Sequence, residues 1–96
     1  MKKKIALIFG HRGGIGTATR NIFLKNDYLI IPVGSSIIDF NKPESDQQIS
    51  DLLHNANPDV VINAVGIFVT GYTNTHTATM NINFGSNWSI LKHYLD

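Results

Sequence analysis

The chain has 96 residues, 43% of them hydrophobic, and its 8 lysines and arginines against 7 acidic residues give a formal net charge of +1. This is the composition of an ordinary globular domain, and the balanced charge excludes a strongly basic nucleic-acid-binding protein. The sequence holds no cysteine, which excludes a disulfide framework and thiolate chemistry.

No apolar run approaches the roughly 20 residues of a membrane-spanning helix, and the run 5–9 after three lysines is too short for a signal peptide. We therefore expect a cytoplasmic protein with neither a membrane nor a nucleic acid as partner. Lysines 2–4 are expected to form a solvated entry to the first strand. The four histidines lack metal-site spacing and have no neighbouring acid in sequence, so no metal is expected.

The first expected strand, residues 5–9, leads into four glycines within seven residues, Gly10, Gly13, Gly14 and Gly16. Glycines let a turn approach a phosphate closely, and the first N–H groups of a following helix point at the anion. The loop therefore predicts a nucleotide site, although a glycine-rich turn also serves where a strand only reverses. No Lys-Ser/Thr pair follows, which argues against a Walker-type ATPase.

Helical and extended patterns alternate along the rest of the chain. Ile15, Ala18 and Ile22 form the apolar stripe of a helix ending near residue 26, and 28–33 reads as a strand covered on both faces. A short strand over 37–40, a helix opening at 43–46 and ending at 56, and a strand over 59–66 follow. A loop over 67–77 precedes a last helix. The expected buried stripes of the two later helices are Ile49, Leu52, Leu53 and Ala56, and Met80, Phe84, Trp88, Leu91 and Leu95.

This alternation predicts an α/β fold, a partial Rossmann-like three-layer arrangement around a parallel sheet with strand order 3-2-1-4. In such a sheet the ligand lies beyond the carboxyl ends of the strands, where the order reverses. Four stretches are expected to meet at that edge, namely 10–16, 34–36, 39–40 and 63–66.

The glycine loop resembles the T-G-x-x-x-G-x-G motif of the short-chain dehydrogenase/reductase family, with Phe9 in place of the threonine and Gly10, Gly14 and Gly16 as the family glycines. The resemblance implies that residues 1–96 are the N-terminal part of a single NAD(P)-binding Rossmann-fold domain. The cofactor-binding residues that it implies are Gly10, His11, Arg12, Gly13, Gly14, Ile15, Gly16, Gly34, Ser35, Ser36, Asp39, Phe40, Asn63, Ala64, Val65 and Gly66.

Asp39 is similar to the family aspartate that accepts from the adenine amino group, although an Asp that caps the turn into the next helix is the alternative. Residues 63–66 resemble the family N-N-A-G turn. The second strand ends at Gly34, where an acid would take the ribose hydroxyls of NAD. Because Arg12, Ser35 and Ser36 can donate to a phosphate, NADP is favoured over NAD.

Asn83 resembles the helix asparagine that supports the proton relay in this family. The family's Tyr-x-x-x-Lys catalytic pair is absent from the sequence. The chain is therefore expected to be the cofactor-binding part of an oxidoreductase that acts on a carbonyl or alcohol. Stretches 57–64 and 39–44 are similar to the sugar-nucleotide reductase and epimerase branch. A non-catalytic dinucleotide-binding or protein-interaction module is the alternative, and the open edge of the fourth strand favours self-association into a homo-oligomer.

Overall fold

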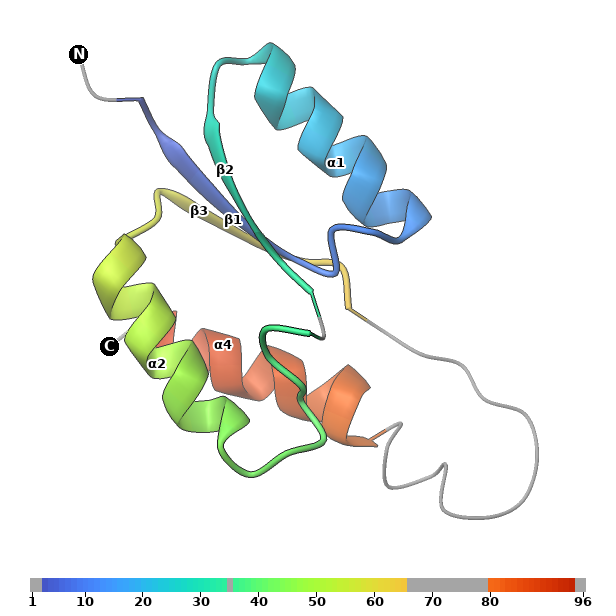
Figure 1. Ribbon diagram of the computed structural model, residues 1–96, viewed down its shortest axis with the longest axis vertical. Helices are drawn as coiled ribbons and strands as arrows, with labels where there is room; N and C mark the ends of the chain where they lie inside the picture. The colour runs from blue at the N-terminus through green and yellow to red at the C-terminus, as the bar shows by residue number, and fades with distance from the viewer. Residues whose placement is uncertain (1–2, 35, 66–79, 95–96) are drawn as a thin grey trace.

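The computed structural model describes residues 3–34, 36–65 and 80–94 (Figure 1). Within these ranges three strands form one parallel sheet in the order β2-β1-β3. The elements in chain order are β1 (Ile5–Phe9), α1 (Gly14–Lys25), β2 (Leu29–Val33), α2 (Ser45–Ala56), β3 (Val60–Asn63), the π-helix η1 (Met80–Gly85) and α4 (Ser86–Tyr94). The expected α/β class is confirmed.

β1 occupies the centre of the sheet because it is apolar on both sides. Its residues Ala6 to Phe9 are completely buried, and the register pairs Leu7 with Ile31 of β2 and with Val61 of β3. β2 is an edge strand in the described residues. Because Leu29 and Pro32, on its two opposite faces, are both exposed, the expectation that it is covered on both faces is wrong. Its Pro32 is exposed, in keeping with the restriction of proline to edge strands.

The segment 37–40 forms a turn, and the expected strand there is wrong. The N–H groups of Ile37 and Ile38 both donate to the Gly34 carbonyl, at 3.0 and 3.1 Å, so the chain curls immediately after β2. Ile38 is thereby buried, whereas Ile37 faces solvent. With that strand missing, β3 corresponds to the expected fourth strand. The observed order β2-β1-β3 is therefore the 2-1-4 part of the expected order 3-2-1-4.

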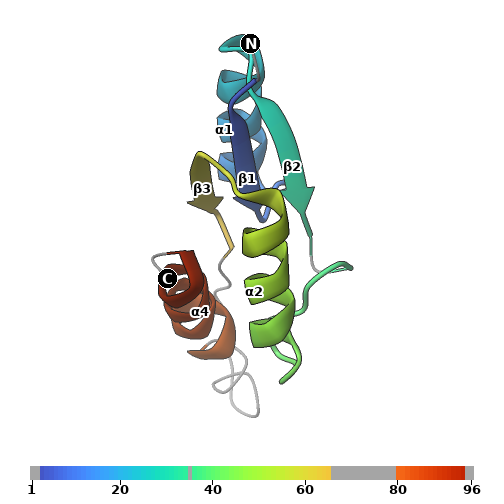
Figure 2. The ribbon, with the colours of Figure 1, turned by 90° about the vertical axis from the view of Figure 1, so that its left-hand side faces the viewer.

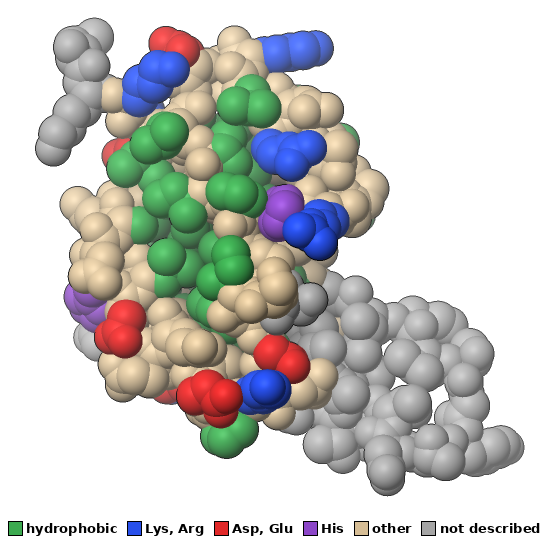
Figure 3. All heavy atoms as spheres, viewed as in Figure 1, with side chains coloured by type: hydrophobic (Ala, Val, Ile, Leu, Met, Phe, Trp, Pro, Cys, Tyr) green, Lys and Arg blue, Asp and Glu red, His purple; other side chains and the backbone are tan. Residues whose placement is uncertain are grey.

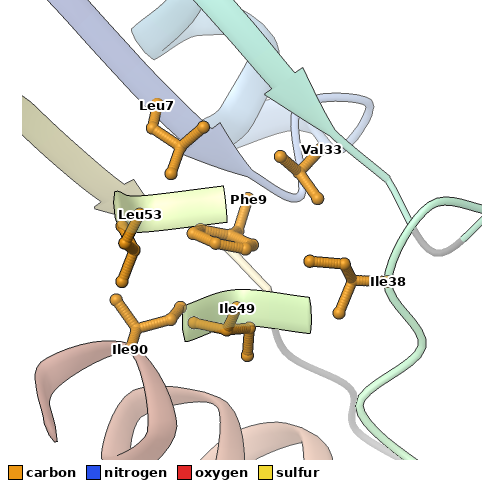
Figure 4. Close-up of a cluster of buried hydrophobic side chains, with 7 residues drawn as sticks. All are labelled: Leu7, Phe9, Val33, Ile38, Ile49, Leu53 and Ile90. Carbon is orange, nitrogen blue, oxygen red and sulfur yellow. The ribbon is translucent and has the colours of Figure 1, made fainter. Parts of the chain in front are cut away.

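Helices cover the two faces of the sheet, α1 on one side and α2 with α4 on the other (Figures 1 and 2). On the second side a cluster of buried side chains converges between the sheet and the two helices (Figure 4). Its members are Leu7, Phe9, Val33, Ile38, Ile49, Leu53 and Ile90. The expected stripe on α2 is confirmed, and Asn57, in the left-handed region at φ +45°, ends that helix before Pro58.

The apolar stripes expected on the other two helices are wrong. Ile15 and Ile22 of α1 are 76% and 60% exposed, because α1 buries Gly16 instead. On α4 the buried residues are Ser86, Ser89 and Ile90. The apolar residues expected to face the core lie outward instead: Phe84 of η1 and Trp88 and Leu91 of α4 are more than half exposed. Met80 and Leu95 of that stripe, and the loop 67–77, fall where the structure gives no side-chain description.

Candidate functional site

The glycine loop joins β1 to α1 at the carboxyl edge of the sheet. Gly10 has φ +77°, and a Cβ there would lie 2.8 Å from the carbonyl carbon of Ala64. Its N–H donates to the Val33 carbonyl at 3.0 Å, and the Ala64 N–H donates to the Phe9 carbonyl at 2.9 Å. The turn is therefore tied to the ends of both neighbouring strands.

Gly14 and Gly16, the next two glycines of the motif, stand in opposite surroundings. A Cβ on Gly16 would overlap the Gly10 carbonyl, whereas a Cβ on Gly14 would meet nothing within 4 Å. The backbone hydrogen-bond ladder of α1 begins at Thr17, whose N–H donates to the Gly13 carbonyl at 2.8 Å. The N–H groups of the first helical turn therefore precede the regular ladder and are available to an anion. Packing explains Gly16, but it does not explain Gly14.

An open cleft of about 300 Å³ lies beside this loop, beyond the ends of β1, β2 and β3. On the face seen in Figure 3, hydrophobic side chains gather in the middle, next to histidine and basic side chains. The cleft is lined by Phe9, Gly10, His11, Arg12, Gly13, Val33, Gly34, Ser36, Ile38, Asp39, Phe40, Ala64 and Val65. Its position is the one at which open parallel sheets bind ligands.

The structure brings most of the expected site residues to this cleft. Gly14, Ile15, Gly16 and Asn63 are not part of its lining, and Ser35 and Gly66 lie outside the described residues. Three apolar lining residues were not expected, Phe9, Val33 and Ile38. Phe9 and Val33 are the last residues of their strands, so their position at the carboxyl edge of the sheet could have been predicted from the sequence. Ile38 depends on the turn that replaces the expected strand.

Asp39 and Phe40 border the apolar part of the cleft. The Asp39 carboxylate accepts the Asn41 N–H through Oδ1 at 3.0 Å, and the Asp39 carbonyl accepts the Lys42 N–H. This is the turn-capping geometry that the sequence left open. The rings of Phe40 and Phe9 pack with centroids 5.9 Å apart. The adenine contact of Asp39 stays a prediction.

Asn63 links the end of β3 to the last helix. Its amide Nδ2 donates to Ser86 Oγ at 3.1 Å and to Asn87 Oδ1 at 2.7 Å, and its Oδ1 accepts the Val65 N–H at 3.1 Å. Asn87 in turn donates to the carbonyl of Asn83 at 2.8 Å. Asn83 lies in η1, a π-helical segment of a kind often found at functional sites. Its supporting role in a proton relay remains a prediction.

A polar cluster fastens α4 to the start of α2. The Asp46 carboxylate accepts from Ser89 Oγ at 2.7 Å, and Lys92 Nζ and His93 Nε2 each lie 3.1 Å from its oxygens. The Ser89 hydroxyl, then His93 and Lys92, lower the pKa of Asp46 from its ordinary value of 3.8 to about 2. His93 thus has an acidic neighbour in space that its sequence neighbours do not supply.

Within residues 3–34, 36–65 and 80–94, no three histidine or acidic side chains are grouped as a metal site would require. The same part of the chain contains no helix with the length and hydropathy needed to cross a membrane.

These observations define a partial Rossmann-like fold with a cleft at the switch point of the sheet. No protein-family model matches the chain, and no curated protein matches it significantly. Solved structures do share the fold. The dTDP-4-dehydrorhamnose reductase of Bacillus anthracis, in complex with NADP, superposes with a TM-score of 0.76 at 15% identity, over 94% of this chain and 31% of its own.

Two further solved structures share the fold of this chain. ElxO with NADP bound gives a TM-score of 0.81 at 20% identity, over 98% of this chain and 50% of its own. The 3-alpha-hydroxysteroid dehydrogenase of Pseudomonas sp. B-0831, complexed with NADH, gives 0.77 at 14% identity, over 95% and 40%. At these identities the likeness shows the fold, which confirms the expected Rossmann-like architecture. The chain spans only 31% to 50% of these three structures.

Proposed function

We propose that this chain binds a nicotinamide dinucleotide, NADP or NAD, in the cleft beyond the carboxyl ends of β1, β2 and β3. The observation that carries the proposal is Gly14, which directly follows the cleft-lining Gly13 and is the first residue of α1. Gly10 and Gly16 are required by the packing of the loop itself, but the space in front of Gly14 is empty. A glycine that packing does not require, at the first residue of α1, leaves room for a pyrophosphate to approach the helix N-terminus.

The cleft lining supports the same assignment. Its apolar end, formed by Val33, Ile38 and Phe40, suits an adenine ring, and Gly10 to Gly13 suit the phosphates. The structural likeness to proteins solved with NADP and NADH supports the proposal at the level of the fold. We also propose that Ile15, Asn63, Ser35 and Gly66 shape the site around this ligand.

We further propose that the chain supplies the binding step of an oxidoreductase that transfers hydride between the nicotinamide and a carbonyl or alcohol substrate. Tyr28 and Tyr72 are followed four residues later by Pro32 and His76, so neither of these tyrosines forms the acid/base pair of the family. The likeness to a dTDP-4-dehydrorhamnose reductase supports a sugar nucleotide as the substrate class.

The test is a calorimetric titration of the 96-residue chain with NADP and with NAD, repeated on Gly14→Val. Valine at position 14 points into open space in the free protein, so the fold should persist, but it stands in front of the phosphate position. We expect roughly a tenfold or greater loss of affinity. Ala18→Val, at an exposed position of the same helix, is the matched control and should bind normally. Binding of neither dinucleotide, or unchanged binding by Gly14→Val, would contradict the proposal.

A further inference from the structure

The side chain of His11 lies against the end of β2. A Cβ built on Gly34 would stand 3.4 Å from His11 Nε2 and 3.8 Å from its Cδ2, and both residues line the cleft. Thr17 fixes the backbone beneath the ring, because its Oγ1 donates to the His11 carbonyl at 3.2 Å. The imidazole therefore lies within van der Waals distance of the side-chain position at residue 34.

The two ring nitrogens of His11 have different surroundings. Nδ1 is buried and has no hydrogen-bond partner in the described part of the chain. A neutral imidazole carries one N–H, and a proton on Nδ1 would be a buried donor without an acceptor, which is costly. The favoured tautomer therefore has its proton on Nε2, the ring nitrogen next to Gly34.

The groups around this strand end are mostly donors. In folds of this kind, an acid at the end of the second strand accepts the ribose hydroxyls of NAD. Gly34 has no side chain, and His11, Arg12 and Ser36 line the cleft around it. Asp39 is the carboxylate in the described lining, and its Oδ1 already accepts a backbone N–H. A donor-rich strand end suits a phosphate, which offers only acceptors once ionised, better than it suits a hydroxyl.

We propose that His11 is the residue that determines the choice of dinucleotide, with Nε2–H donating to the 2′-phosphate of NADP over the bare strand end at Gly34. The inference rests on the proposed function, since it takes the cleft to be the dinucleotide site. The group recognised is a phosphate monoester on the adenosine ribose. NAD, which has a hydroxyl at this position, gains less from the same donor.

The test compares dissociation constants for NADP and NAD in the wild-type chain, His11→Leu and His11→Gln. Leucine keeps bulk but removes the donor, so NADP affinity should fall by roughly tenfold or more, while NAD affinity changes by less than about twofold. Glutamine places an amide N–H near the position of Nε2 and should restore part of the preference. The melting temperature of His11→Leu should not fall, because the substitution removes a buried nitrogen that has no partner.

The control is His54→Leu. His54 lies on α2, outside the cleft lining, and its Nδ1 is 2.7 Å from the Ser50 carbonyl. This variant should keep the wild-type ratio of the two affinities. An unchanged ratio in His11→Leu, or tighter binding of NAD than of NADP by the wild-type chain, overturns the inference and leaves dinucleotide binding intact. A wild-type chain that binds neither compound overturns the proposed function, and this inference with it.

Discussion

The helices on the two faces of the sheet bury their apolar residues to very different degrees. The face toward α2 and α4 encloses a continuous cluster in which Leu7, Phe9 and Ile49 are fully buried. On the other face, α1 packs against β1 and β2 and covers the fully buried Ala6 and Ile8, yet its own Ile15 and Ile22 are largely exposed. Similar apolar spacing in the sequence thus has opposite outcomes. The spacing identifies a helix, but burial also requires a neighbour on the same side of the sheet.

The largest expected effect comes from removing core volume on the closed face. Ile49→Ala should lower the free energy of unfolding by about 2 to 5 kcal/mol, because it leaves a cavity between α2 and the sheet. Ile22→Ala, a matched truncation on the open face, should change it by about 0.5 kcal/mol or less. Urea denaturation of both variants measures the difference. Equal losses would show that the α1 face is covered in solution.

The next effect concerns the contact that lets α1 approach the loop. Gly16→Ala places a methyl group on the Gly10 carbonyl, so the loop must shift, and we expect a loss of about 1 to 3 kcal/mol in the free energy of unfolding. Gly14→Ala has open space and should be neutral or slightly stabilising, since alanine favours helix. Thermal unfolding of the pair distinguishes them, and a stable Gly16→Ala protein would refute the close packing.

A smaller effect is expected from the polar cluster that holds α4 on the closed face. Asp46→Asn removes the charge that Ser89, Lys92 and His93 surround. Because the carboxylate is half exposed and screened by solvent, the loss should be about 1 kcal/mol near neutral pH.

This contribution has a defined pH range. Folding lowers the pKa of Asp46 from 3.8 to about 2, so the stabilisation is fully present above the unfolded value and is lost as the pH falls through the folded one. The stability difference between wild type and Asp46→Asn should therefore shrink between about pH 4 and pH 2. Urea denaturation at several pH values measures it, and a difference that persists at the acid end would assign the effect to something other than this carboxylate.

The smallest effect is expected at the end of α4. The Tyr94 hydroxyl lies 3.1 Å from the Asp59 carbonyl and 3.3 Å from the Pro58 carbonyl, which ties this helix to the entry of β3. Tyr94→Phe removes that donor and keeps the ring, so the loss should be about 0.5 kcal/mol. Chemical denaturation resolves a change of this size, and a loss as large as that of Ile49→Ala would contradict the ranking.

The parts of the fold that local pattern determines were predictable. β1, α2 and the glycine turn follow from apolar runs, capping residues and glycine spacing, and the cleft follows from the rule for open parallel sheets. The turn at Ile37 and Ile38 was not predictable, because two isoleucines after Gly34 favour a strand by propensity, whereas here their N–H groups bond a single carbonyl.

The contacts between distant residues were also beyond sequence reasoning. Asn63 hydrogen-bonds to Ser86 and Asn87, which follow it by more than 20 positions in the sequence. The ring of His11 lies beside Gly34, at a similar separation in the sequence. The resemblance to a known family pointed to Asn63, His11 and Gly34 as site residues. It did not predict which of them lie in contact. The prediction of which side of α4 faces the core was wrong. Small serines face the core instead, because they allow closer helix packing than the aromatic stripe does.

Pro32 makes the two edges of the sheet unequal in their capacity to pair with a further strand. Leu29 donates to the Lys4 carbonyl and the Val33 carbonyl accepts from Gly10, so odd-numbered residues of β2 face β1 and Pro32 faces outward without an N–H. A strand arriving at β2 would meet a missing donor. β3 contains neither a proline nor a charged residue, so no backbone donor is missing from its outer side. In the described part of the chain, further strands can therefore be templated from β3 far more readily than from β2.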